Sequence, residues 1–124
     1  MNVDFNDLPW HDAILRSIYV DRNNPGERDV VKLLINWPDE ETTSNLEFGD
    51  CYGLTANMNF GVVASESILM AECVDDCDEL RSMRQEWSNG GVNLDQLKCY
   101  KITTNSTNSS ISIFALHFKL EKDK

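Results

Sequence analysis

Positive charge is missing from the middle of this sequence. Between Leu33 and Leu80 there is no lysine, arginine or histidine, although this stretch holds eleven aspartates and glutamates. The rest of the chain has 10 acidic and 11 basic residues, so the net charge of −10 arises almost entirely in this segment. An acidic chain repels the phosphates of nucleic acids and of anionic membranes, and we therefore expect neither as a partner.

Long apolar runs and cofactor motifs are also missing. No apolar run approaches the roughly 18 residues that a membrane span needs. Residues 1–7 have neither the basic nor the apolar part of an export signal, so we expect a cytoplasmic protein. The six glycines form no phosphate-binding loop, and no cofactor is expected. The 124 residues are enough for one core, and we expect a single domain over 1–124.

Metal-binding patterns are weak. Cys73 and Cys77 are separated by three residues, whereas zinc sites usually separate their paired cysteines by two. No histidine lies between residues 12 and 116 to complete a ligand set. We therefore expect no metal, and reduced, mostly buried thiols at the four cysteines.

Alternating apolar residues predict strands over 13–21, 28–37, 44–48, 51–60, 98–104 and 110–120. In the first strand, Ile14, Ile18 and Val20 are expected on one face, and Leu15 and Tyr19 on the other. The turn-rich segments 21–26 and 105–109 predict two hairpins. Residues 62–74 fit either a strand or a short helix, and we favour a strand over about 67–73. The last strand is apolar on both faces, which favours a central position.

One helix is expected near residues 77–88. Leu80, Met83 and Trp87 form an apolar stripe at helical spacing, Asp76 can cap the N-terminus, and glycines follow the C-terminus. The pattern predicts an α+β fold: a mostly antiparallel curved sheet or small sandwich of about six or seven strands with one helix.

Two histidines raise the question of chemistry. His11 stands beside Asp12 at the start of the first strand, and a carboxylate stabilises an imidazolium. Adjacent residues at the start of a strand usually point apart, however, so a structural role at a polar corner is the alternative. His117 lies in the last strand, on the face of Ile111 and Ile113. A metal-binding or hydrolytic site built from His11, Asp12 and His117 requires the first and last strands to be neighbours.

The cation-free segment is the other candidate. Its carboxylates could simply solvate the surface, but their concentration favours a surface that attracts a basic protein partner. The candidate binding residues are Asp39, Glu40, Glu41, Glu47, Asp50, Glu66, Glu72, Asp75 and Asp76.

Two short motifs carry a family resemblance. One is Leu8-Pro9-Trp10-His11-Asp12-Ala13, directly before a strand, and the other is Phe48-Gly49-Asp50-Cys51-Tyr52-Gly53-Leu54, followed by the asparagine-rich turn 57–60. This pattern resembles a group of small bacterial domains, some of which are similar to immunity proteins of polymorphic toxin systems. The resemblance spans residues 8–74 and implies a cytoplasmic, non-enzymatic protein that binds and blocks a toxin domain.

These observations favour a non-enzymatic acidic binding protein, and the resemblance points to an immunity-type inhibitor of a basic toxin domain. Two alternatives stay open. One is a small metal-binding protein or hydrolase that uses His11, Asp12 and His117, and the other is a structural or accessory domain. The sequence does not indicate an oligomeric state.

Overall fold

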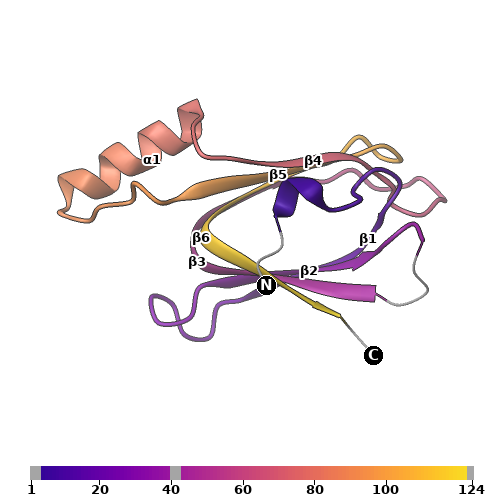
Figure 1. Ribbon diagram of the computed structural model, residues 1–124, viewed down its shortest axis with the longest axis horizontal. Helices are drawn as coiled ribbons and strands as arrows, with labels where there is room; N and C mark the ends of the chain where they lie inside the picture. The colour runs from indigo at the N-terminus through magenta and orange to yellow at the C-terminus, as the bar shows by residue number, and fades with distance from the viewer. Residues whose placement is uncertain (1–3, 40–42, 123–124) are drawn as a thin grey trace.

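The computed structural model describes residues 4–39 and 43–122. In chain order its elements are η1 (Phe5–Asp7), β1 (Ile14–Asp21), β2 (Val30–Asn36), β3 (Thr43–Asn57), β4 (Ile68–Val74), α1 (Asp78–Asn89), β5 (Lys98–Thr104) and β6 (Ser110–Lys122). The six strands form one open antiparallel sheet in the order β1-β2-β3-β6-β5-β4 (Figure 1). The expected α+β class is confirmed, and so are both hairpins and the central position of the last strand. No described helix has the length and apolar character that crossing a membrane requires.

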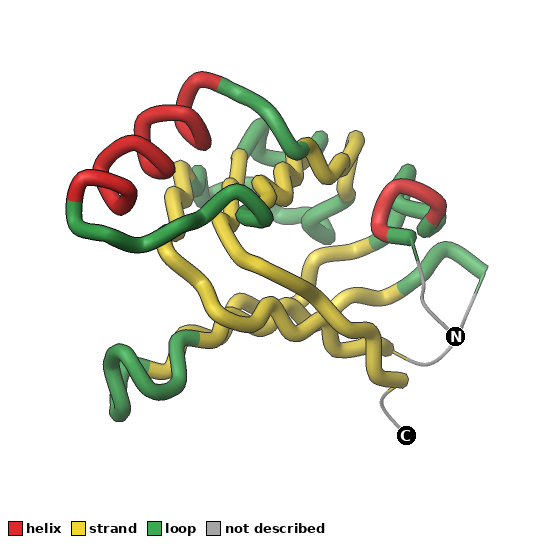
Figure 2. The backbone as a smooth tube through the Cα atoms, turned by 60° about the vertical axis from the view of Figure 1, so that its left-hand side comes forward, coloured by secondary structure: helices red, strands yellow, loops and turns green. Residues whose placement is uncertain are grey.

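The sheet folds over on itself near the middle of β3 and β6. β2 pairs with β3 only as far as Phe48, whereas β5 pairs with β6 only from Ser110 to Ala115. β3 and β6 pair with each other along almost their whole length, so these two strands belong to both halves. Figure 1 shows β1 and β2 below, β4 and β5 above, and the bend of β3 and β6 on the left. The two halves face each other, and Figure 2 shows the same bend with α1 beside the upper half.

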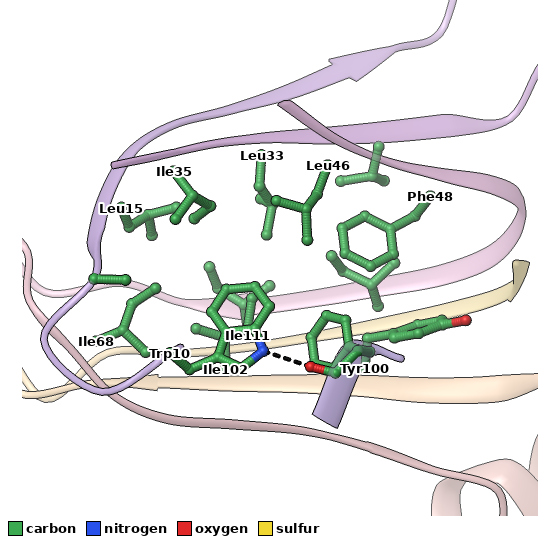
Figure 3. Packing of buried hydrophobic residues seen from close by; sticks show 14 of the residues in the cluster. Trp10, Leu15, Leu33, Ile35, Leu46, Phe48, Ile68, Tyr100, Ile102 and Ile111 are labelled. Atoms are coloured by element: carbon green, nitrogen blue, oxygen red, sulfur yellow. Dashed lines mark hydrogen bonds between the residues drawn. The ribbon is translucent and has the colours of Figure 1, made fainter. Parts of the chain in front are cut away.

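The main hydrophobic core fills the space between the two halves (Figure 3). Leu33, Ile35, Leu46 and Phe48 reach it from the lower half and are fully buried. The upper half contributes residues from β5 and β6, such as Ile102. A smaller cluster lies on the other face of the upper half, where α1 packs; its buried members are Leu80, Leu94, Leu97, Cys99 and Phe114.

The bend depends on two residues of β3. A side chain at Gly49 would collide with the imidazole ring of His117, which lies directly across on β6. Asp50 has a φ of 51°, in the left-handed region that residues with a side chain rarely adopt. A register shift between Cys51 and Gly53 then completes the change of direction. The expected break of the strand at Gly49-Asp50 is therefore a bend within one continuous strand.

Substitutions at Asp50 should reveal the cost of this conformation. Asp50→Ala and Asp50→Gly both remove the carboxylate, but only alanine has a side chain that opposes a left-handed backbone. We expect Asp50→Gly to be more stable than Asp50→Ala by about 1 kcal/mol, measured by urea unfolding. Equal stability of the two variants would contradict a bend that requires the positive φ.

The predicted helix is present, but a different residue caps its N-terminus. It spans Asp78–Asn89 and ends at Gly90, as expected. The predicted cap is wrong: Cys77 is the N-cap residue and makes no capping bond through its side chain. The Asp76 carboxylate instead accepts hydrogen bonds from Arg81, at 2.9 and 3.3 Å, because the guanidinium offers a charge that the helix amides lack. Within α1 only Leu80 is fully buried.

Candidate functional site

His11 and Asp12 lie at the corner where the two edges of the sheet meet. The backbone N–H of Asp12 donates to the carbonyl oxygen of Ile68 on β4 at 3.0 Å, and Ile68 donates back to Ala13 at 2.7 Å. His11 Nδ1 lies 3.2 Å from the carbonyl oxygen of Leu69. Both side chains are mostly exposed and their charged groups are 3.7 Å apart. These contacts tie the chain before β1 to the edge of β4.

His117 makes a different pair at the bend. Its Nε2 lies 3.1 Å from Oδ2 of Asp50, and both side chains are exposed. The structure thus gives His11 and His117 separate partners, on β4 and on β3. In the sheet order, β2 and β3 lie between the first strand and the last, so these strands are not neighbours. Among the described residues, no three histidines, cysteines or carboxylates are grouped as a metal site requires.

The four thiols are free, and Cys99 alone is fully buried. Desolvation by burial raises the pKa of the Cys51 thiol to about 11 and that of the Cys99 thiol to about 12. Burial raises the pKa of Cys73 as well. A thiol with a raised pKa is protonated near neutral pH and is a poor nucleophile. Burial therefore makes these three cysteines poor candidates for a catalytic nucleophile.

The structure distributes the acidic candidates over several surfaces. Glu47 lies on the outer face of the lower half, Glu66 accepts a hydrogen bond from Thr107 at 2.6 Å, and Glu72 is exposed opposite Lys101. Asp39, Asp75 and Asp76 are exposed in loops, and Asp50 lies at the bend. Glu40 and Glu41 lie outside the described residues. The acidic candidates that the structure describes are close together in the sequence but do not form one continuous acidic face.

Glu47 in particular is neutralised. Its carboxylate lies 3.1 Å from Nζ of Lys119 and 3.7 Å from Nζ of Lys32, on the two neighbouring strands. The hydrogen bond from Lys119 is the main reason why the pKa of Glu47 is lowered below its ordinary value of 4.5. Because the folded state holds this proton less tightly, the pair stabilises the fold above the ordinary pKa and loses its effect as the pH falls through the lowered value.

Glu47→Gln should remove this pH-dependent contribution. We expect the variant to be less stable than the parent by about 0.5–1 kcal/mol at pH 7, with the difference shrinking below about pH 4. Thermal unfolding from pH 3 to pH 7 measures both. Glu27→Gln is the matched control, since Glu27 is exposed and forms no ion pair among the described residues. A constant difference across this pH range would contradict the assignment.

One groove lies at the bend. It has a volume of about 680 Å³ and runs between the end of the β1–β2 hairpin, the second half of β3 and Trp87 of α1. We call it the hairpin groove. In Figure 1 the end of the β1–β2 hairpin projects at the lower left and α1 lies at the upper left. Its apolar lining includes Val20 and Leu54, whereas the charges of Arg22 and Asp29 form an ion pair at 2.9 Å.

A second groove lies between α1 and the second half of β3. We call it the helix groove; it has a volume of about 530 Å³ and is lined by Thr55, Asp78, Glu79, Ser82, Met83, Glu86 and Phe114. Asp78 bonds to Arg81 at 2.6 Å. No cation among the described residues lies within ion-pair distance of Glu79 or Glu86. This groove therefore combines free negative charge with an apolar floor.

From the sequence we did not assign Trp87, which lines the hairpin groove, or Glu86, which lines the helix groove, to a binding surface. Trp87, expected to face the core, is 41% exposed and contacts the ring of Tyr52 edge-on with centroids 5.0 Å apart. Glu86 follows Arg81 and so lies outside the cation-free segment. Its position seven residues after Glu79 places both on one helix face, and this spacing was readable in the sequence.

Comparison with models of known protein families gives no match, and comparison with curated proteins gives none either.

Proposed function

We propose that the protein is a non-enzymatic binding protein for a basic protein partner, and specifically an immunity-type inhibitor of a basic toxin domain in the cytoplasm. The main support is the helix groove, where no cation of the described residues lies within ion-pair distance of the Glu79 and Glu86 carboxylates that line it. Unpaired charge at a concave surface attracts a partner of opposite charge and speeds association.

The aromatic residues beside the groove support the same proposal. Trp87 is partly exposed and contacts the half-buried Tyr52 edge-on, and tryptophan and tyrosine side chains at a surface are frequent energetic centres of protein interfaces. Polar charge at the rim with an aromatic centre is the usual composition of a specific interface.

The hydrolase alternative has less support. His11 and His117 contact different strands, and the pKa values of Cys51, Cys73 and Cys99 are raised. A working acid–base pair or activated thiol needs a second polar group held against it in a pocket. The described grooves hold neither histidine in their lining.

The test begins with the protein encoded by the neighbouring reading frame. We expect its C-terminal domain to be basic and toxic, and co-expression of this chain to restore growth. In calorimetry, the affinity should weaken at least about tenfold between ~50 mM and ~500 mM salt, because screening weakens charge attraction. Tight binding that is independent of salt would contradict the electrostatic proposal, and a neighbour without toxicity would contradict the immunity role.

A further inference from the structure

One edge of β3 is left unpaired where the sheet bends. β2 accompanies β3 only to Phe48, and the last backbone contact on that side is the bond from Cys51 N–H to the Asp29 carbonyl at 3.0 Å. β6 continues to pair on the opposite side as far as Asn57. Within the described part of the chain, the edge of β3 from Tyr52 to Asn57 therefore faces no other strand.

β4 and β1 are partly protected against an added strand, whereas β6, like β3, has no partner on its outer side beyond Ala115 among the described residues. Along β4, Asp12 and His11 bond to the backbone at Ile68 and Leu69, and the Asn6 side-chain amide bonds to both backbone groups of Cys73, at 2.7 and 3.3 Å. β1 carries a bulge between Leu15 and Ser17, a feature that discourages a new strand from pairing. The unpaired part of β3 has no such cover, although unprotected edges invite pairing with other chains.

This edge opens into both grooves. Leu54 lines the hairpin groove, and the next residue, Thr55, lines the helix groove. Successive residues of a strand point to opposite faces, so an added strand would also present alternate side chains to the two sides. On the helix side these would meet Glu79 and Glu86, and on the other side the apolar surface at Leu54.

We propose that an extended segment of the partner, with alternating basic and apolar residues, adds as a strand along Tyr52–Asn57. This inference rests on the proposed function and specifies how the basic partner is held. The segment's backbone supplies hydrogen bonds to the unpaired groups of β3, its lysines or arginines face the helix groove, and its apolar residues cover Leu54. The negative charge of Glu79 and Glu86 in the helix groove is the reason why we expect a basic segment there.

The test uses a synthetic peptide of about eight residues that alternates lysine and valine, matched to the length of an average strand. Two further versions carry N-methyl groups on alternate amides, each blocking one edge of the peptide. We expect the parent peptide and one methylated version to bind within about twofold of each other, and the other version to bind at least about tenfold more weakly. Amide exchange should slow at residues 52–57.

Each other outcome has a distinct meaning. Equal affinity of both methylated versions, protection on β1 instead of β3, or no binding of the parent peptide would overturn strand addition. If binding is insensitive to methylation yet lost on exchange of lysine for glutamate, the basic-partner function stands without strand addition. If the glutamate peptide binds as well as the lysine peptide, the proposed function fails. Glu79→Gln with Glu86→Gln should weaken the parent peptide, whereas Asp7→Asn with Asp95→Asn, at two exposed carboxylates that line neither groove, should not.

Discussion

Trp10→Ala is expected to lower the free energy of unfolding by about 3–5 kcal/mol. Trp10 is almost fully buried and joins Phe5 to Trp37, with ring centroids 4.7 and 5.1 Å away. Its indole Nε1–H donates to the Phe5 carbonyl at 2.8 Å, as the dashed line in Figure 3 shows. Truncation would leave a large cavity at the corner that positions the first strand. Urea unfolding followed by far-UV circular dichroism measures the loss.

Two controls separate packing from polarity at this corner. Trp10→Phe keeps an aromatic ring but leaves the Phe5 carbonyl with only the longer bond from Leu8 N–H, at 3.3 Å, and should cost about 1–3 kcal/mol. His11→Ala removes a mostly exposed side chain with one long contact and should cost less than about 1 kcal/mol. If His11→Ala were as destabilising as Trp10→Ala, the histidine and not the tryptophan would hold the corner.

Arg84→Ala should destabilise the fold by about 2–3 kcal/mol and loosen α1. The Arg84 guanidinium donates to three backbone carbonyls on two segments that flank the helix. Its Nη2 bonds to Asp75 at 2.8 Å and to Leu97 at 2.7 Å, and its Nε bonds to Leu94 at 3.1 Å. Without it, the Leu97 carbonyl loses its side-chain donor, the Leu94 carbonyl keeps only the bond from Leu97 N–H, and the helix is held mainly by Leu80 and Met83. Amide exchange within residues 78–89 should accelerate in the variant.

Arg81→Ala is the matched control on the same helix. The side chain of Arg81 is exposed and bonds to the exposed carboxylates of Asp76 and Asp78, so its removal should destabilise the fold far less than that of Arg84. Similar destabilisation by the two substitutions would mean that arginine charge, and not the carbonyl bonds, fastens the helix. Trp87 of α1 lines the hairpin groove, so loosening of the helix in Arg84→Ala should also disturb the proposed interface.

The strands were predictable because their apolar residues alternate. The face of the sheet on which each side chain lies was not predictable. In β1 the bulge between Leu15 and Ser17 changes the phase, so that Leu15 and Ile18 both reach the main core. Simple alternation placed them on opposite faces. In β6 the bend has a similar effect, because Phe114 packs beneath α1 while Phe118 reaches the main core.

The bend itself could not be predicted because it depends on contacts between distant residues. Gly49 and Asp50 have the composition of an ordinary turn, and only the pairing with His117 makes them a fold in a continuous strand. The grooves follow from this bend, since β3 leaves β2 there. Sequence analysis therefore located the acidic character of the chain but missed Glu86 and Trp87, whose importance comes from their position beside the second half of β3.

The central claim is that the surface along β3 and α1 binds a basic partner. The most direct measurement is the affinity of the neighbouring toxin domain for the double variant Glu79→Lys/Glu86→Lys and for the control Asp7→Lys/Asp95→Lys, which makes the same total change of charge at exposed positions outside both grooves. We expect the double variant to bind at least about a hundredfold more weakly and the control to change by less than about threefold. Equal effects of the two, after confirmation by circular dichroism that both are folded, would contradict the claim.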